Sequence, residues 1–429
     1  MSTIIYWFRN DLRLKDNPAF LQACTDAHHL MPIYIHPPGH DEITPWGFPR
    51  VGEHRQKFLK ESIQDLRANL NSLGSDLIEF IGDPEQIFTA LQIQLKTNIV
   101  YCETIEAPEE IAQISALKKA GFAVTECWQS SMLDAKDLPF ELQNIPDIFT
   151  QFRQQIEKTE PVKQTKQSRL RFTNPIEAPS VIPKFPTIPP QIITSNEEQL
   201  QPPQKITGLF QGGETALQAH IEQYFVRRLP DTYKQTRNQL IGLDYSSKFS
   251  PWLAHGCCSA RMLAKKIDDY EAQYGANDGT YWLWFELLWR DYFRFIHFKY
   301  GKKLYRSKGL SDKPAKQFNL EKFNEWSRAN TGEKLVDCGM RELNLTGYLS
   351  NRMRQIVASY WIYDMSGDWQ AGAAWFESQL VDYDVYSNQG NWLYIAGHGT
   401  DPRGGRAFNV KKQTQDHDPC GLYQKMWLA

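Results

Sequence analysis

The 429-residue chain lacks any hydrophobic run of the roughly 18 residues that a membrane-spanning helix needs. Its start, Met1–Asn10, also lacks the charged region and the small-residue cleavage site of a signal peptide. The seven cysteines, an odd number, contain no C-x-x-C pair, which argues against both a disulfide framework and a zinc site. We therefore expect a cytoplasmic protein with no membrane contact, no bound metal and mostly buried thiols.

Net charge is also scarce, because 48 Lys and Arg against 50 Asp and Glu give −2. The charge is unevenly distributed, however. Residues 201–429 hold 29 basic and 24 acidic side chains, a net +5, which leaves 19 and 26, a net −7, for residues 1–200. Ten of the 13 tryptophans lie from Trp252 onward. Basic and aromatic residues together are typical of surfaces that bind single-stranded or extruded nucleotides, but an excess of five charges is also typical of an ordinary solvated surface.

The first third of the chain alternates short β-type runs with amphipathic stretches, which predicts βαβ units and a doubly wound parallel sheet. The predicted strands are Ile4–Phe8, Met31–Ile35, Leu77–Phe80, Asn98–Tyr101 and Ala123–Cys127. Helical patterns run over Glu53–Leu73 and Glu109–Ala120. Such sheets bind ligands beyond the carboxyl ends of their strands. No G-x-G-x-x-G follows a strand, so no dinucleotide site is predicted by motif.

A proline-rich stretch separates this region from the rest of the chain. Nine of the 24 prolines lie between Pro161 and Pro203, among polar residues with little periodicity, as in an interdomain connector. From Glu214 onward the pattern is almost entirely helical, which predicts an α-bundle. We therefore predict an α/β domain at residues 1–135, a linker at 136–205 and a helical domain at 206–429.

A hydroxyl-rich turn with one lysine lies near the start of the helical domain, where Ser246, Ser247, Lys248 and Ser250 precede Pro251. A turn of this composition at a helix start can hold a diphosphate through backbone N–H groups, hydroxyls and the lysine. The same residues also fit a plain helix start, with Ser250 as the N-cap and Pro251 at the first helical position. Both interpretations stay open at this point.

An unusually aromatic helix is predicted over Tyr281–Phe298, which reads YWLWFELLWRDYFRFIHF. Glu286, Trp289, Arg290 and Phe293 fall at i, i+3, i+4 and i+7, so they share one face. A carboxylate and a guanidinium are costly to bury on an apolar helix without partners. This face is therefore expected to line a pocket.

A third group of polar residues follows further along the chain. Arg354 comes first, and Asp382 and Asp384 are both expected to form a buried ion pair with it. Asn388 then supplies an amide, and the glycines that follow it are expected to let a flat ligand approach the backbone. This density of specific residues is too high for packing alone.

Taken in order, these motifs resemble the photolyase/cryptochrome family, and most closely its DASH subgroup. The likeness runs from WFRNDLRLKDNPAF near the start to DPRGGRAFN and YQKMWL near the end, and it includes SKFSPWLAHG, FELLWRDYFRF, SNRMRQIVAS and DYDVYSNQGNW. The subgroup is indicated by PDIFTQFR at 146–153, by Gln355 and by Tyr394, because the double-strand repair enzymes usually carry Met and Trp at the last two positions.

The resemblance implies an FAD cofactor in the helical domain. Carried over position by position, the family's phosphate and ribose contacts fall on Tyr233, Ser246, Ser247, Lys248, Phe249 and Ser250. The residues that surround the flavin ring match Arg354, Asp382 and Asp384, and the residue facing flavin N5 matches Asn388. An amide can hydrogen-bond either redox form of a flavin, which fits this assignment.

The implied activity is that of a deoxyribodipyrimidine photo-lyase, a carbon–carbon lyase. Electron transfer from light-excited reduced FAD would repair cyclobutane pyrimidine dimers, preferentially in single-stranded DNA, where extruding a base costs less. The resemblance assigns catalytic roles to Glu286, Trp289 and Asn388, and DNA contacts to Arg237, Arg290, Arg352, Gln355 and Tyr394. The alternative is a blue-light photoreceptor with little repair activity. In either case we expect a monomer.

Two accessory features are also implied. The subgroup usually carries 5,10-methenyltetrahydrofolate as an antenna, and Glu106 and Arg153 lie in the matching stretches. The family relays electrons to the flavin through three tryptophans, of which Trp392 and Trp369 match the inner two. No tryptophan lies between Lys302 and Glu325, where the outer one is expected. Photoreduction is therefore either slow or completed by another residue, and the candidates are Tyr305, Trp326 and Trp375.

Overall fold

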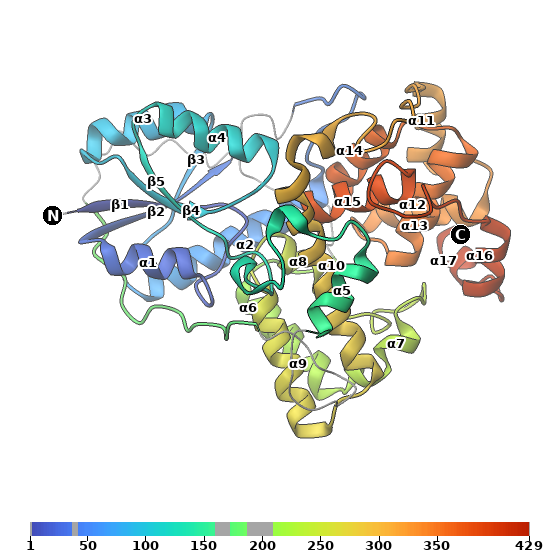
Figure 1. Cartoon of the computed structure of the whole chain (residues 1–429), viewed down its shortest axis with the longest axis horizontal. Coiled ribbons are helices and arrows are strands. Elements are labelled where there is room, and N and C mark those ends of the chain that lie inside the picture. Colours follow the sequence, from blue (N-terminus) through green and yellow to red (C-terminus); the bar gives the residue numbers. More distant parts are fainter. Residues whose placement is uncertain (1, 37–41, 159–171, 187–208, 429) are drawn as a thin grey trace.

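The computed structural model describes residues 2–36, 42–158, 172–186 and 209–428 and contains an α/β domain followed by a helical domain (Figure 1). The first domain contains β1 (Thr3–Phe8), α1 (Pro18–Asp26), β2 (His29–His36), α2 (Glu53–Ser72), β3 (Ile78–Ile81), α3 (Pro84–Leu95), β4 (Ile99–Glu103), α4 (Pro108–Lys119) and β5 (Ala123–Cys127). The connecting region contains η1 (Ala135–Asp137), η2 (Leu142–Asn144) and α5 (Phe149–Lys158).

The helical domain begins with α6 (Glu214–Val226), η5 (Leu229–Thr232), α7 (Tyr233–Thr236), α8 (Ser250–Ala254), α9 (Ala260–Tyr274), α10 (Asp278–Tyr300) and η6 (Gly301–Tyr305). It continues with α11 (Leu320–Ser327), α12 (Lys334–Thr346), α13 (Asn351–Ser359), η7 (Tyr360–Asp364), α14 (Trp369–Gln379), α15 (Val385–Ala396), α16 (Val410–His417) and α17 (Leu422–Leu428). The predicted fold class is therefore confirmed.

The five strands form one parallel sheet in the order β3-β2-β1-β4-β5, with helices on both faces (Figure 1). Alternate residues of β1 point to opposite faces, as the pleat requires. Tyr6 and Phe8 join the core that continues into the helical domain, whereas Ile5 and Trp7 pack with α3 and α4. The five predicted strands are confirmed. From β1 the sheet is extended by β2 and β3 on one side and by β4 and β5 on the other, so the strand order reverses at β1, and ligands bind at such points.

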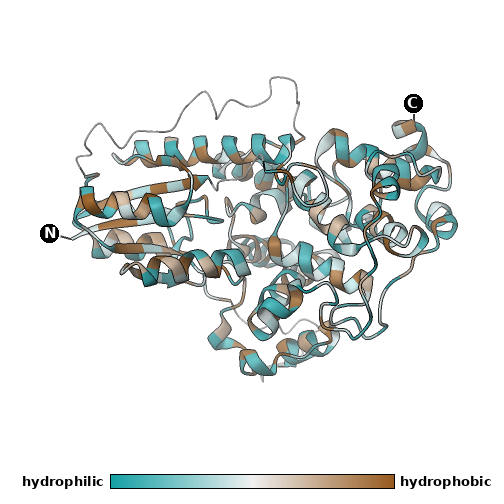
Figure 2. Ribbon diagram, turned by 90° about the horizontal axis from the view of Figure 1, so that it is seen from above, coloured by the Kyte–Doolittle hydropathy of each residue, from teal (hydrophilic) through white to brown (hydrophobic). Residues whose placement is uncertain are grey.

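Figure 2 shows hydrophobic residues concentrated along the strands and hydrophilic residues on the outward turns of the covering helices. This pattern follows from amphipathic helices that bury one stripe against a sheet. Within the described ranges, no helix is both long and apolar enough to cross a membrane. Four of the seven cysteines are fully buried, so the expectation of mostly buried thiols is confirmed.

The two domains share one core and are joined by buried polar contacts. The Asp291 carboxylate on α10 accepts hydrogen bonds from the backbone N–H groups of Met132 (2.9 Å) and Leu133 (2.8 Å). Arg13 donates to the carbonyl of Gly256 at 3.0 Å. A side chain at Gly256 would collide with the carbonyl of Asn10, because an added Cβ would lie 1.8 Å from it. The backbones of the two domains therefore meet at a glycine.

Candidate functional site

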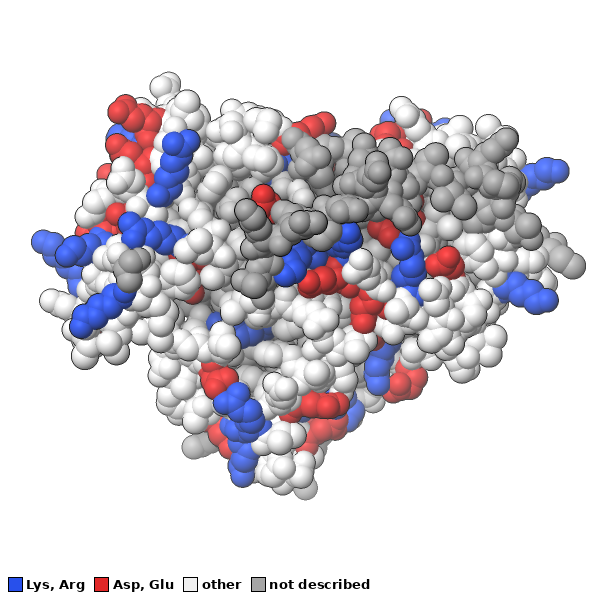
Figure 3. All heavy atoms as spheres, turned by 180° about the vertical axis from the view of Figure 1, so that it is seen from behind, with Lys and Arg blue, Asp and Glu red and all other residues white. Residues whose placement is uncertain are grey.

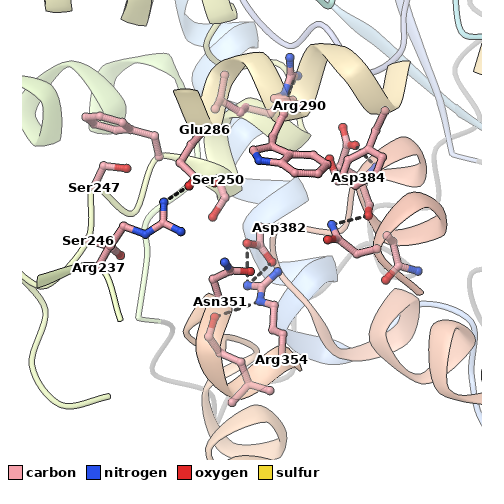
Figure 4. A pocket seen from close by; sticks show the side chains of 18 of the residues that line it. Arg237, Ser246, Ser247, Ser250, Glu286, Arg290, Asn351, Arg354, Asp382 and Asp384 are labelled. Carbon is pink, nitrogen blue, oxygen red and sulfur yellow. Dashed lines mark hydrogen bonds and ion pairs between the residues drawn. The ribbon is translucent and has the colours of Figure 1, made fainter. Parts of the chain in front are cut away.

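A cavity of about 560 Å³ lies in the helical domain (Figure 4). Its volume falls within the range of roughly 300–1,000 Å³ that is usual for pockets that hold cofactors and drug-sized ligands. Its walls come from the turn before α8, one face of α10, the start of α13 and the residues around α15. These are the three groups of residues that stand out in the sequence.

The predicted face of α10 lines this cavity. Glu286, Trp289, Arg290 and Phe293 are all part of its wall. The helix begins with a capping box in which Asn277 and Thr280 satisfy each other's backbone N–H groups, which fixes the register of the aromatic stretch that follows. The prediction that this face lines a pocket is therefore confirmed.

The serine turn lies at one side of the cavity, with Ser246, Ser247 and Ser250 around it (Figure 4). Ser250 is the first residue of α8 and Phe249 is the N-cap, with no capping hydrogen bond from a side chain. The interpretation of Ser250 as an N-cap is therefore wrong. Because the Ser250 hydroxyl is not used to cap the helix, it can face the cavity.

Lys248 is buried in the same turn, with 5% of its surface exposed. Its ammonium group lies 3.4 Å from the ring centroid of Tyr245 and 4.5 Å from that of Tyr348. Burial lowers the pKa of Lys248 to about 7, although Glu342 opposes the shift. An anionic group in this part of the cavity would stabilise the charged lysine.

Arg354 and Asp382 form an ion pair in the middle of the cavity wall (Figure 4), with Nη2 of the arginine 2.8 and 2.9 Å from the two carboxylate oxygens. Asp384 does not join them. It pairs instead with Arg294 of α10 and accepts the N–H of Ser387 at 2.8 Å as the N-cap of α15. The expectation that both aspartates pair with Arg354 is therefore wrong for Asp384.

The environment of Asp384 explains this difference. Burial by itself would raise the pKa of Asp384, but Arg294 and Arg290 outweigh burial and hold the pKa well below its usual value. The side chain of Arg294 is 3% exposed, so this is a buried charge pair. Asp384 is fixed by the start of α15, and Arg294 is the cation that α10 presents to that position.

Glu286 and Arg237 form an ion pair at the side of the cavity that carries the serine turn (Figure 4). Arg237 also lies over the ring of Trp282, 4.6 Å from its centroid. Burial raises the pKa of Glu286, and Arg237 partly offsets this effect. The arginine and the carboxylate to which the family resemblance assigns contacts with DNA and the lesion are thus direct neighbours.

The other residues predicted to contact DNA differ in the partners that they have in the structure. Arg290 donates to the backbone carbonyls of Ser130 and Leu253, so its guanidinium ties the two domains together. The DNA contact of Arg290 stays a prediction. Arg352 donates to the side chain of Gln355 at 3.1 Å. Gln355 itself lines the cavity, as does Tyr394.

A second cavity of about 400 Å³ lies between the domains, and its lining includes Arg9 and Asn10, which follow β1, and Ala107 and Pro108, which follow β4. Arg9 lines it, and its Nη1 has no hydrogen-bond partner among the described residues. Asn388 and Tyr383 line both cavities, so they form part of the wall between them. The Asn388 amide nitrogen donates to the carbonyl of Ala373 at 3.0 Å, which orients its oxygen.

The expected electron relay is divided between the cavities. Trp392 lines the first cavity and Trp369 lines the second. The glycines near Asn388 serve packing, which corrects the expectation that they admit a flat ligand. A Cβ at Gly390 would lie 2.2 Å from the ring of Phe293, and one at Gly397 would lie 2.1 Å from the carbonyl of Gly404.

Glu106 and Arg153 line neither cavity. The backbone N–H of Glu106 donates to the hydroxyl of Tyr386, whose ring packs against His297. Arg153 donates to the hydroxyl of Tyr281. Tyr281 and His297 are 16 residues apart on α10, about 24 Å at roughly 1.5 Å per residue, so the structure does not bring Glu106 and Arg153 together.

Comparisons with known proteins agree with this geometry. A family model described as "DNA photolyase" matches residues 4–171, and one described as "FAD binding domain of DNA photolyase" matches residues 282–429. Cryptochrome DASH of Gloeobacter violaceus is 41% identical over 437 residues, which cover 99% of this chain and 85% of that protein. The chain belongs to the cryptochrome DASH family.

Solved structures extend the likeness to three dimensions. The crystal structure of a Synechocystis cryptochrome has a TM-score of 0.92 and 40% identity, and the match covers 99% of this chain and 88% of that one. A photolyase from Sulfolobus tokodaii, described as holding two FAD molecules, has a TM-score of 0.79 and 25% identity, with coverage of 100% and 90%.

The helical domain of this DASH chain is of the FAD-binding type, and the first cavity has the groups that such a cofactor needs. Lys248 is a buried cation that an anion would stabilise, and it lies beside three serines. The Arg354–Asp382 pair presents a donor and an acceptor to a planar ring. The charged and hydrogen-bonding side chains of the first cavity therefore fit a flavin adenine dinucleotide.

Several residues of the site are absent from the sequence-based set. Phe149 of α5 stacks on Trp289, Arg294 pairs with Asp384, and Arg406 lines the cavity and donates to the Tyr394 hydroxyl at 2.6 Å. Each has a sequence signal, because Phe149, Arg294 and Arg406 lie within the motifs PDIFTQFR, FELLWRDYFRF and DPRGGRAFN.

Proposed function

We propose that this protein repairs cyclobutane pyrimidine dimers by light-driven electron transfer, with a preference for single-stranded DNA. The observation that supports this proposal is the grouping of Glu286, Arg237 and Trp289 on one cavity that also contains Arg354, Asp382 and Asn388. Lesion-binding and flavin-binding chemistry therefore share one space.

The residues around the cavity would hold FAD at two ends. Ser246, Ser247, Ser250 and Lys248 would bind the diphosphate, while Tyr233 and Phe249 contribute further wall beside them. Arg354 and Asp382 would hold the polar edge of the flavin ring, with Asn388 at its side. When bound and reduced, FAD supplies the electron that splits the dimer under blue light.

The remaining task of the protein is to bind an extruded dimer. Glu286 would accept a hydrogen bond from a ring N–H of the pyrimidine dimer, which requires Arg237 to release it and turn to a DNA phosphate. Trp289 has Phe149 on one face, so the dimer would pack against its remaining surface. These groups replace the water that an open cavity would hold.

The preference for single strands follows from two features. Extruding bases from a duplex costs a few kcal/mol, and the cost is lower in a single strand or at a lesion. The face seen in Figure 3 carries basic and acidic side chains interspersed. A chain with a net charge of only −2 has little phosphate attraction with which to open a duplex.

We also propose an antenna chromophore at the domain interface, with 5,10-methenyltetrahydrofolate as the first candidate. The second cavity lies between the domains and contains the partnerless Nη1 of Arg9. To test this, the protein is purified with folate supplied, and its near-ultraviolet absorption is measured. Loss of that absorption in Arg9→Ala supports the second cavity, whereas loss in Glu106→Ala or Arg153→Ala supports the stretches named by resemblance.

The main experiment uses a thymine-dimer oligonucleotide, single-stranded or duplex, with FAD-loaded and reduced protein under blue light. We expect light-dependent monomerisation of the single-stranded substrate, greatly weakened in Glu286→Gln and retained in Glu321→Gln, an exposed carboxylate on α11. Dark samples serve as the second control. Absence of repair by protein with bound, reduced FAD would favour the alternative, a blue-light photoreceptor.

A further inference from the structure

Tyr305 and His297 form a hydrogen-bonded pair outside the lesion site. The Tyr305 hydroxyl lies 3.1 Å from Nε2 of His297, and Nδ1 of His297 lies 2.7 Å from the carbonyl oxygen of Phe293. A carbonyl only accepts, so Nδ1 carries the hydrogen and Nε2 is the acceptor for the tyrosine O–H. The phenol is therefore positioned to lose its proton to a base.

This pair lies next to Trp369. Tyr305 and Trp369 both line the second cavity. The indole N–H of Trp369 donates to the carbonyl of Ser307 at 2.7 Å, and the neighbouring Gln370 donates to the carbonyl of Tyr305 at 3.2 Å. Trp369 thus rests on the segment that carries Tyr305.

Trp369 in turn lies one helical turn from Gly372, which packs against Trp392 of the first cavity. Gly372 is one turn along α14 from Trp369, and a Cβ at Gly372 would lie 2.3 Å from the ring of Trp392. The first turn of α14 therefore connects the two indoles. The series from the first cavity outward is Trp392, Trp369 and then Tyr305.

Among the described residues, none of the other candidates for an outer donor is hydrogen-bonded to a base. The ring of Trp326 lies 6.4 Å from that of Trp392 and stacks on Trp361 at 5.4 Å. The indole N–H groups of Trp326 and Trp361 donate to the carbonyls of Val357 and Asp368. A carbonyl cannot take up a proton, so a cation left on these rings keeps its charge and can recover the electron. Within the part of the chain that the structure describes, the ring of Trp375 reaches theirs through contacts with Phe323.

We propose that Tyr305 is the terminal electron donor for light-driven reduction of the flavin and that His297 accepts its proton; this rests on FAD occupying the first cavity. Light-excited, oxidised FAD is the oxidant, and the electron that it gains comes from Trp392, which is refilled from Trp369. Tyr305 then returns one electron to Trp369. Its O–H bond breaks, an N–H bond forms at His297 Nε2, and a neutral phenoxyl radical and an imidazolium remain.

The surroundings hold both groups in the protonation states from which this coupled transfer starts. Burial lowers the pKa of His297 to about 4, with Arg294 acting in the same direction and Asp384 against it, so the imidazole is neutral and able to accept a proton. Burial raises the pKa of Tyr305, and Glu110, Asp384 and Glu377 add to the rise, so the phenol keeps its proton until it is oxidised. An external thiol then reduces the phenoxyl radical, and the proton returns from His297.

The test measures photoreduction of oxidised, FAD-loaded protein under blue light with dithiothreitol and without DNA. FAD stoichiometry is first established by absorbance in each variant. We expect Tyr305→Phe to slow flavin reduction by about a hundredfold, the lower end of what a positioned proton acceptor contributes, and His297→Gln to slow it similarly. Tyr300→Phe, whose hydroxyl bonds Asp147, and Trp326→Phe should match the wild type.

A spectroscopic readout separates this role from a structural one. Transient electron paramagnetic resonance should show a tyrosyl radical in the wild type that is absent from Tyr305→Phe, and its formation should slow in D₂O. Equal photoreduction by wild type and Tyr305→Phe, or an indole radical as the long-lived species in both, would overturn the proposal while leaving FAD binding intact. Failure of the wild type to bind FAD would instead overturn the proposed function and this inference with it.

Discussion

Phe149 lies flat on Trp289, with ring centroids 3.6 Å apart and an angle of 13° between the planes. Phe149 begins α5 in the segment that connects the two domains, whereas Trp289 belongs to the face of α10 that lines the first cavity. Stacked aromatic rings contribute about 0.5–1.5 kcal/mol beyond the burial of their surfaces. The connector therefore helps to hold the indole against which we propose the lesion packs.

Replacing Phe149 by alanine should therefore weaken binding of a dimer-containing single strand and lower the free energy of unfolding. A buried Phe→Ala change costs about 3–5 kcal/mol, which urea unfolding measures directly. Phe140→Ala is the matched control, since Phe140 packs on Phe152 and has no ring contact with Trp289. Equal losses of lesion affinity in the two variants would show that Phe149 acts on stability alone.

The two aspartates near the flavin cavity should have separable roles. Asp382→Asn removes the carboxylate that answers Arg354, so we expect loss of FAD binding, measured by flavin absorbance after gel filtration. Asp384→Asn leaves the buried Arg294 without its partner, and breaking such a pair costs about 3–5 kcal/mol. The contrary result, loss of FAD binding in Asp384→Asn with unchanged stability, would indicate that Asp384 contacts the flavin ring.

Asp384 should also contribute to the loss of folding stability at acid pH. Its pKa is depressed in the folded protein, so its contribution is present above the unfolded pKa of about 3.9 and is lost as pH falls below it. Asp384→Asn removes this contribution at all pH values. Unfolding curves at pH 7 and pH 3 should therefore differ less in the variant than in the wild type.

The sequence predicts those parts of the molecule that follow from local periodicity. The five strands and the shared face of Glu286, Trp289, Arg290 and Phe293 repeat with the period of a strand or a helix, and each was found in place. Lys248 and its serines are also local, because a single turn carries them. No packing information was needed for these predictions.

The sequence did not predict which side chains pair with one another, because these pairings depend on how helices that are distant in sequence pack together. Asp384 sits two residues from Asp382, yet α10 offers it Arg294 while Arg354 reaches only Asp382. Arg290 likewise shares a face with Glu286, but the α/β domain supplies the carbonyl of Ser130 that occupies it. The site residues were therefore predictable as a set, whereas their pairings were not.

Arg352 should contribute to DNA affinity through a phosphate contact. It lies at the start of α13 beside Gln355 and Asn238, and its Nε has no hydrogen-bond partner among the described residues. Arg352→Ala should lower affinity for single-stranded DNA and reduce the slope of log K against log salt by about 1. Arg341→Ala is the control, because Arg341 donates to the carbonyl of Trp427 near the end of the chain. An unaltered salt slope in Arg352→Ala would argue against the contact.

Binding of FAD should weaken as the pH rises above 7. Burial lowers the pKa of Lys248 to about 7, so the free protein loses this charge above that pH. A bound diphosphate would restore the charge, and binding must then take up a proton. The dissociation constant for FAD should therefore rise by up to about tenfold per pH unit above 7.

Two variants identify the group that is responsible. Lys248→Arg keeps its charge throughout this range, so its affinity for FAD should be independent of pH between 7 and 9. Glu342 also faces Lys248, and burial raises the pKa of Glu342 to about 7, so it titrates in the same range. Glu342→Gln should therefore retain the pH dependence if Lys248 carries it. A flat profile for the wild type, measured by fluorescence titration, would show that Lys248 is already charged before FAD binds.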